Sequence, residues 1–271
     1  MVGRDEELSE LRSLLAEARD GQPVVALVCG EAGIGKSRLL AEFAQMTRDE
    51  ALVLVGRCVD LGGISLPFAP VTEVFRGLTR EFPSQRIPAI LGATRHELGR
   101  LVPQLSERRA VPVDDRPDPH TRAGLFSAVL DAFELLARDR PLVVAFEDLH
   151  WADRSTLDLV GYLAANLRAT KVLFLATFRT DELHRRHPLG PVLAELARVR
   201  TVVRLDLSPL GAEEVAEQIA AIRGSAPAAD LVDEIFHRSD GNAFYVEQLL
   251  AESTPHAADR LPSGLRDVVL S

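Results

Sequence analysis

The chain has 271 residues, of which 46% are hydrophobic and 26% are charged, and its formal net charge is −9. This composition is typical of a globular protein with one large domain, or with one domain and a smaller one. The acidic balance argues against direct nucleic-acid binding, because such a surface repels phosphate backbones. The charged, helical start MVGRDEELSELR is unlike a secretory signal, and no apolar run is long enough to span a bilayer, so we expect a cytoplasmic protein without membrane contact.

Five short apolar runs predict strands that are buried on both faces, as in a parallel sheet. Helical patterns between most of them indicate a doubly wound α/β fold. Cys29 and Cys58 lie in two of these runs, and we expect both to be buried, reduced thiols. The predicted strands are Val24–Cys29, Leu52–Cys58, Leu142–Phe146, Val172–Phe178 and Val202–Leu207. The predicted helices between them are Ser37–Met46, 125–136, Ser155–Leu167 and Pro191–Arg198.

Two regions depart from this alternation. Residues 60–120 are rich in proline, with Pro117 and Pro119 inside the acidic loop VDDRPDPH, and predict two or three helices inserted between the second and third strands. After Ser208 only helical patterns follow. We therefore expect an α/β domain at 1–207 and a small helical lid domain at 208–271. The helical pattern that begins in LPSGLRDVVLS stops unfinished, so we expect the lid to be truncated and the chain to be a fragment.

The segment VVALVCGEAGIGKSRLL matches the phosphate-binding pattern G-x-x-x-x-G-K-[ST], between a predicted strand and a predicted helix. Glycines allow the backbone to approach phosphate oxygens and to aim its N–H groups at them, and the helix start adds its positive dipole end. Lys36 supplies a charge for the β- and γ-phosphates, and Ser37 a hydroxyl for Mg²⁺. The loop predicts a purine nucleotide, ATP or ADP, bound with Mg²⁺. Its expected binding residues are Gly30, Glu31, Ala32, Gly33, Ile34, Gly35, Lys36, Ser37 and Arg38.

Two acids end the third predicted strand, in the segment PLVVAFEDLHWAD. Ligands bind at the carboxyl ends of parallel strands, so Glu147 and Asp148 are expected to face the phosphate loop. One would hold Mg²⁺ and the other would orient the attacking water, and the shorter Asp148 is favoured for the metal. The alternative is a pair of solvated carboxylates that cap the next helix. In the same segment we expect His150 to be packed or at the surface and Asp153 to be a helix N-cap.

The fourth predicted strand ends in Thr177 and Arg179. Arg179 would stabilise charge on the γ-phosphate. Equally, it would pair with Asp181 or Glu182 at the surface.

Several segments in this order resemble the nucleotide-binding region of the STAND class of AAA+-related ATPases. They are VGRDEEL, GEAGIGKS, GRC at 56–58, EDLHWAD, ATFRTDEL, LSPL and GNAFYVEQLL. The pattern is most similar to large LuxR-type transcriptional regulators of the maltose-activator kind and to ATPase modules of some bacterial adenylyl cyclases.

The resemblance implies a P-loop NTPase fold with sheet order 5-1-4-3-2. It implies that Val2, Gly3 and Arg4 pack on adenine and that Gly241 belongs to a motif that touches the base side of the nucleotide, although Ala243 replaces the usual proline. It also implies slow ATP hydrolysis, self-association in the ATP state, and DNA binding only through a C-terminal domain absent from this chain.

Three functions compete at this point. The first is a regulatory ATPase module that acts as a nucleotide-dependent switch. The second is a small-molecule kinase that uses the same loop, and the third is a nucleotide-bound scaffold without turnover. A kinase usually builds its acceptor site within the sheet domain, whereas here the helical block follows the fifth strand, which favours the switch.

Overall fold

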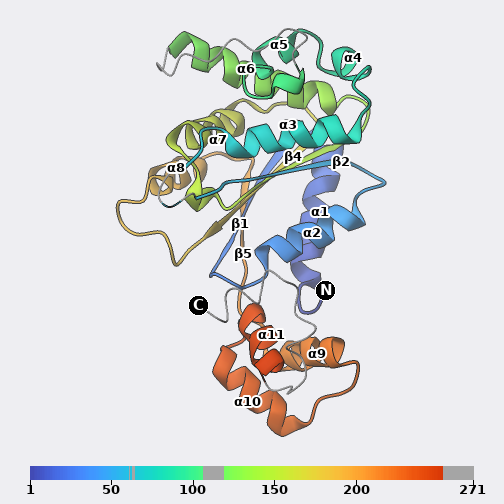
Figure 1. The fold of residues 1–271 in the computed structure, drawn as a ribbon, viewed down its shortest axis with the longest axis vertical. Coiled ribbons are helices and arrows are strands. Elements are labelled where there is room, and N and C mark those ends of the chain that lie inside the picture. The colour runs from blue at the N-terminus through green and yellow to red at the C-terminus, as the bar shows by residue number, and fades with distance from the viewer. Residues whose placement is uncertain (61, 63–64, 106–118, 253–271) are drawn as a thin grey trace. The chain divides into compact units, whose positions relative to one another are not determined.

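A computed structural model describes residues 1–60, 62, 65–105 and 119–252 (Figure 1). Its centre is a five-stranded sheet of β1 (Val24–Gly30), β2 (Leu52–Arg57), β3 (Leu142–Glu147), β4 (Val172–Arg179) and β5 (Val202–Asp206). Every pairing is parallel and the strand order is β2-β3-β4-β1-β5. This is the order 5-1-4-3-2, so the predicted P-loop NTPase fold is confirmed.

By their internal contacts, the residues form two compact units. The sheet unit contains 6–31 and 36–206, and the helical unit contains 1–5, 32–35 and the chain from Leu207 onward. The tip of the predicted phosphate loop, 32–35, is thus grouped with the helical unit, while both ends of the loop belong to the sheet unit. The acidic loop at 113–118 and the pattern at 261–271 lie outside the described residues.

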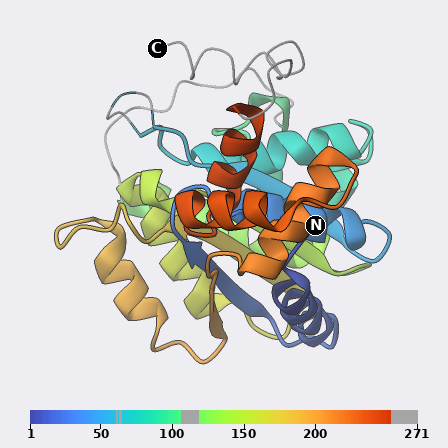
Figure 2. The same cartoon turned by 90° about the horizontal axis from the view of Figure 1, so that it is seen from below.

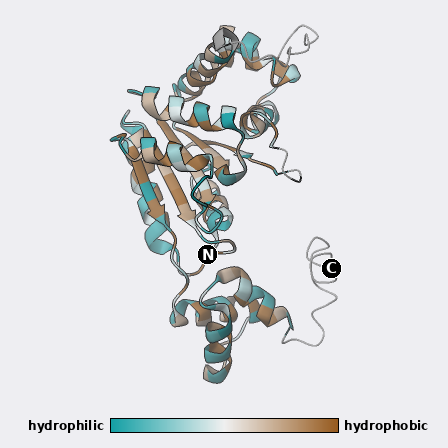
Figure 3. Cartoon of the chain, turned by 90° about the vertical axis from the view of Figure 1, so that its left-hand side faces the viewer, coloured by the Kyte–Doolittle hydropathy of each residue, from teal (hydrophilic) through white to brown (hydrophobic). Residues whose placement is uncertain are grey.

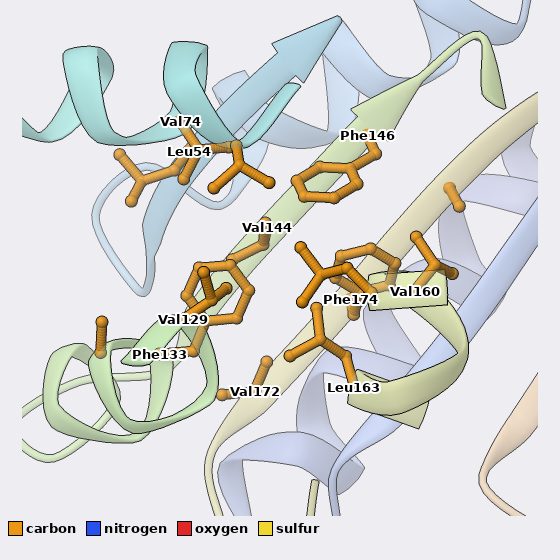
Figure 4. Close-up of a cluster of buried hydrophobic side chains, with 14 of the residues drawn as sticks. Leu54, Val74, Val129, Phe133, Val144, Phe146, Val160, Leu163, Val172 and Phe174 are labelled. Atoms are coloured by element: carbon orange, nitrogen blue, oxygen red, sulfur yellow. The ribbon is translucent and has the colours of Figure 1, made fainter. Parts of the chain in front are cut away.

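Two layers of helices cover the sheet (Figure 1). The helices α1 (Asp5–Arg19) and α2 (Lys36–Met46) lie on one face. On the other face, alternate strand residues pack against α3 (Ala69–Glu81), α6 (Pro119–Leu136), α7 (Arg154–Asn166) and α8 (Leu189–Leu196). Figure 4 shows this core, in which Phe146 and Phe174 meet edge to face at 4.9 Å. The inner strands β1, β3 and β4 are buried along nearly their whole length, as predicted, because helices cover both faces, and Figure 3 shows them as brown ribbons. The prediction of burial on both faces is wrong for the edge strands β2 and β5, in which exposed residues alternate with more buried ones.

In its described part, the proline-rich region between β2 and β3 forms helices joined by loops, as predicted. They are α3, α4 (Ile87–Leu91) and α5 (Arg95–Leu98), with short 3₁₀ turns at Gly92–Thr94 and Pro103–Leu105. Of these helices, α3 packs against the sheet, since its residues Val71, Val74 and Phe75 are fully buried in the main core. Gly56 on β2 permits the close approach of α3, because a Cβ at Gly56 would lie 2.0 Å from the Pro70 carbonyl oxygen.

The helical unit is built from α9 (Ala212–Arg223), α10 (Ala229–Ser239) and α11 (Ala243–Glu252). Each of these helices contacts the other two (Figure 2). A small apolar cluster holds them together, with six buried side chains: Leu210, Val215, Ile219, Ile235, Val246 and Leu250. Among the described residues, no helix is long and apolar enough to cross a membrane.

Candidate functional site

The phosphate loop has the backbone that its glycines predict. Gly30, Gly33 and Gly35 have φ angles of 155°, 75° and 105°, a range that side chains disfavour. The loop leads directly from the buried strand β1 into α2, whose first residue is Lys36.

Lys36, which belongs to the sheet unit, is a buried cation at the end of this loop. It is only 6% exposed, and its ammonium donates to the carbonyl oxygens of Gly30 at 2.8 Å and Glu31 at 2.6 Å. Burial, and then the positive charge of Arg179, lower the pKa of Lys36. Two of its three donors therefore bind the loop itself, in a position where an anion would relieve the cost of burying the charge.

The end of β3 meets the start of α2 through Glu147. The hydroxyl of Ser37 donates to Glu147 Oε2 at 2.8 Å, and Arg57 Nη2 lies 3.4 Å from the same oxygen. Glu147 is 5% exposed, and Arg57 is its register partner on β2. A buried carboxylate and a serine hydroxyl in contact are the oxygen ligands that Mg²⁺ prefers.

Asp148 occupies a different place from Glu147. It is a left-handed residue with φ 60° and ψ 48°, and its backbone N–H donates to Thr177 Oγ1 at 2.9 Å. Burial, followed by the negative charge of Glu147, raises the pKa of Asp148. The adjacent acids thus have different contacts: Glu147 is hydrogen-bonded to Ser37 of the phosphate loop, whereas Asp148 lies within electrostatic reach of Arg179, Arg57 and Lys36.

Arg179, at the end of β4, is held by a cluster of neighbours. Its guanidinium pairs with Glu182 at 2.6 Å and lies 5.2 Å from the centre of the Trp151 ring, and its backbone N–H donates to His150 Nδ1 at 3.3 Å. His150 is 5% exposed, and burial lowers its pKa to about 4. The ion pair expected for Arg179 is present, with Glu182 as its partner.

Asp153 is the N-cap of α7, as predicted, and accepts from the backbone N–H groups of Ser155 and Thr156. It also accepts from the backbone N–H of Phe68, the residue that precedes α3. The same carboxylate therefore connects the region before α3 to the segment that follows the two acids.

Both cysteines are free and buried, as predicted. Cys29 Sγ donates to Asp206 Oδ1 at 3.0 Å, and burial raises its pKa to about 11. Burial also raises the pKa of Cys58, whose backbone N–H donates to the Glu147 carbonyl oxygen. These thiols are protonated packing residues of the strand ends.

The remaining predicted site residues, apart from Arg38, belong to the helical unit. Arg4 is 4% exposed and donates to the carbonyl oxygens of Ile34 at 3.1 Å and Ser208 at 2.7 Å. A Cβ on Gly3 would lie 2.7 Å from Glu214 Oε1, and one on Gly241 would lie 2.2 Å from the Leu210 carbonyl oxygen. Gly241 is therefore needed for close packing of two backbone segments in this unit, whereas Gly3 faces side-chain atoms of Glu214 and Leu210. Val2 is half-buried, and in the sheet unit Arg38 is exposed in the first turn of α2.

Three contacts of these loops are not predicted by the sequence patterns: those of Arg57, Thr177 and Asn242. Arg57 lies in the GRC segment and is the last residue of β2, and parallel strand ends meet at one edge of the sheet, so its position was a usable signal. Thr177 is expected only as a polar residue at a strand end that faces the ligand, and its contact with the Asp148 N–H is not predicted. Asn242 is part of GNAFYVEQLL, and its side chain donates to the Ala32 carbonyl oxygen at 2.8 Å.

Among solved structures, the chain is similar to Cdc6p from Pyrobaculum aerophilum, at 15% identity and a TM-score of 0.49, over 84% of this chain and 51% of that one. It is also similar to a STAND protein with a tetratricopeptide repeat sensor from Pyrococcus horikoshii, at 14% identity and a TM-score of 0.47, over 90% of this chain and 28% of that one.

Among curated proteins, an uncharacterized protein of Rhizobium meliloti (strain 1021) is 28% identical over 92% of this chain. The chain spans 24% of that relative's length. A family profile described as an AAA ATPase domain matches residues 1–176, which include the phosphate loop, both acids and most of β4. The chain therefore belongs to the AAA ATPase domain family, and this membership implies that it binds a nucleotide.

Proposed function

We propose that this chain is a regulatory ATPase module of the STAND type, a nucleotide-dependent switch within a bacterial LuxR-type transcriptional regulator. The observation that carries the proposal is the 2.8 Å hydrogen bond from Ser37 to Glu147, which brings the phosphate loop and the acidic strand end together within the sheet unit. Loops and acids in this arrangement serve nucleotide hydrolysis in P-loop proteins.

The loop residues fit a triphosphate. Three glycines with positive φ leave the backbone free to approach an anion, and Lys36 adds a buried positive charge beside the amides at the start of α2. Lys36 would hold the β- and γ-phosphates. An acidic protein can do this because the attraction is local to the loop.

The contacts favour Glu147 on the metal side, although side-chain length alone had favoured Asp148. Glu147 already shares a hydrogen bond with Ser37, the residue whose hydroxyl would be an Mg²⁺ ligand. A bound Mg²⁺ would neutralise charge on the phosphates. Asp148 is then available to orient water, and its raised pKa suits a carboxylate that accepts a proton.

Arg179 is proposed as the residue that senses the γ-phosphate. Its present partner is Glu182, which is about one-third exposed, so the ion pair is weak enough to exchange. An arginine that leaves a surface carboxylate for a phosphate gives the switch a differential affinity for ATP over ADP.

The binding experiment is a titration of ATP, ADP and GTP, with and without Mg²⁺, followed by the fluorescence of Trp151, the only tryptophan. Phosphate release is assayed on the same sample. We expect adenine nucleotides to bind at micromolar concentrations with slow phosphate release. Binding of neither ATP nor ADP would refute the proposal, and transfer of phosphate to an acceptor would indicate a kinase.

Two matched variants test the roles of the acids, since each removes one charge with little change of shape. Glu147→Gln should lose the Mg²⁺-dependent part of ATP affinity, whereas Asp148→Asn should keep that affinity and lose phosphate release. The reverse pattern would assign the metal to Asp148.

Light scattering with ADP and with a non-hydrolysable ATP analogue tests the switch. The switch predicts a larger particle with the analogue than with ADP, provided that the inducer is present.

A further inference from the structure

The outer side of the phosphate-loop tip is occupied by donors from the helical unit. Three successive carbonyl oxygens of the tip each accept one hydrogen bond. The donors are Asn242 Nδ2 to Ala32 at 2.8 Å, the Phe244 backbone N–H to Gly33 at 3.1 Å, and Arg4 Nη2 to Ile34 at 3.1 Å. All six residues belong to the helical unit.

These three hydrogen bonds fix the direction of the carbonyl groups and, through the peptide planes, that of the N–H groups that follow them. In a planar trans peptide, the C=O of one residue and the N–H of the next point in opposite directions. The described chain has no cis peptide bond. Holding the carbonyls of Ala32, Gly33 and Ile34 outward therefore holds the following three N–H groups, those of Gly33, Ile34 and Gly35, toward the other side. Those are the amides that a phosphate loop presents to its anion.

Asn242 makes hydrogen bonds with both the oxygen and the nitrogen of its side-chain amide. Its Oδ1 accepts from the backbone N–H groups of Phe244 at 3.2 Å and Tyr245 at 3.4 Å, which caps α11. Its Nδ2 donates to Ala32, and the residue is 7% exposed. Gly33 makes room for it, since a Cβ there would lie 2.7 Å from Asn242 Oδ1.

We propose that Asn242 and Arg4 are positioning residues for phosphate binding, which set the direction of the loop amides from behind. This inference rests on the proposed function and adds to it the contacts that couple nucleotide to the helical unit. The coupling is reciprocal, because a ligand that orders the loop also strengthens the hold of the helical unit on it.

The main test separates the two ends of Asn242. Asn242→Asp and Asn242→Ser both keep an oxygen that caps α11, since Asn, Asp and Ser are about equal at that position. Both remove the donor to Ala32, and the carboxylate also repels that carbonyl. We expect Asn242→Asp to weaken binding of both MgATP and ADP about tenfold, the effect of one lost hydrogen bond plus repulsion. Asn242→Ser adds no charge, so a pure capping role predicts wild-type affinity for this variant, and that result would overturn the proposal.

Hydrogen exchange of the nucleotide-free protein gives a readout that does not depend on binding. Asn242→Ser should speed exchange mainly at Gly33, whose amide shares a peptide with the Ala32 carbonyl. Arg4→Met, which keeps an unbranched apolar stem, should speed it mainly at Gly35. The amides of Val246 and Leu250 in α11 should exchange at the wild-type rate in Asn242→Ser.

These outcomes are distinguishable from failure of the proposed function. If the wild type binds no nucleotide, the function fails, while the exchange pattern still decides whether the two side chains orient the loop. Exchange that rises equally across the helical unit, or nowhere in the loop, would overturn the inference. If Asn242→Asp does not fold, Asn242→Ser and Arg4→Met carry the same test.

Discussion

Gly241 and Gly224 form a matched pair that tests the packing of the helical unit. Both have left-handed backbones, with φ 72° and 73°. A Cβ on Gly241 would lie 2.2 Å from the Leu210 carbonyl oxygen, whereas one on Gly224 would have no atom within 4 Å. Alanine at either position costs about 1 kcal/mol for the backbone conformation alone.

Gly241→Ala adds a clash between two backbone segments. To relieve it, residues 210 and 241 must separate, which strains packing by about 1–3 kcal/mol and breaks the 2.8 Å hydrogen bond from the Leu210 N–H to the Gly241 carbonyl, worth about 1 kcal/mol. We therefore expect Gly241→Ala to cost about 2–4 kcal/mol more than Gly224→Ala. For a unit with six buried apolar side chains in its core, this is a large part of the stability.

The assay is hydrogen exchange of α9–α11 as a function of urea, because two units need not unfold together and a single bulk transition would mix them. The Gly224→Ala variant controls for the backbone conformation. Equal stabilities of the two variants, within about 0.5 kcal/mol, would refute the reasoning, since the Leu210 contact would then impose no cost.

Three other predictions concern the sheet unit. Gly56→Ala should destabilise it by about 2 kcal/mol or more in urea unfolding, because its Cβ would meet the backbone of Pro70. Burial lowers the pKa of His150 from its ordinary 6.5 to about 4, so the unfolded chain takes up the proton first as the pH falls. The free energy of unfolding should therefore fall by up to about 3 kcal/mol between pH 6.5 and 4. His150→Asn should lose much of this pH dependence, and equal pH profiles of the wild type and the variant would contradict the prediction. Cys29 and Cys58 should react with a thiol reagent at neutral pH only after unfolding, since both are buried with a raised pKa, and rapid labelling of the native protein would count against the strand-end packing.

The strands could be predicted closely from the sequence. Each apolar run ends within one residue of its observed strand. For the inner strands β1, β3 and β4 the reason is that helices cover both faces, so that the whole strand is apolar. The meeting of Ser37 with Glu147 also follows from a general rule, as parallel strands bring their carboxyl ends to one edge. Strand order did not follow from the pattern of residues and came from the family resemblance.

Other features depend on contacts that periodicity does not encode. Side-chain length can be read from the sequence, but the left-handed backbone of Asp148 and the contact of Glu147 with Ser37 cannot. Phe68 is left-handed where its N–H meets Asp153, which is 85 positions away in the chain. The donor from Asn242 reaches a carbonyl 210 positions away. A single sequence reveals such residues as polar, but it does not reveal which backbone group each one binds.

The most direct test of nucleotide binding at this loop is isothermal titration of MgATP and MgADP into the wild type and Lys36→Ala. We predict micromolar binding by the wild type and a loss of at least a hundredfold in the variant, because the substitution removes the buried charge, 6% exposed, that faces the loop. Equal affinity of the two proteins would place the nucleotide elsewhere and contradict the assignment of the loop.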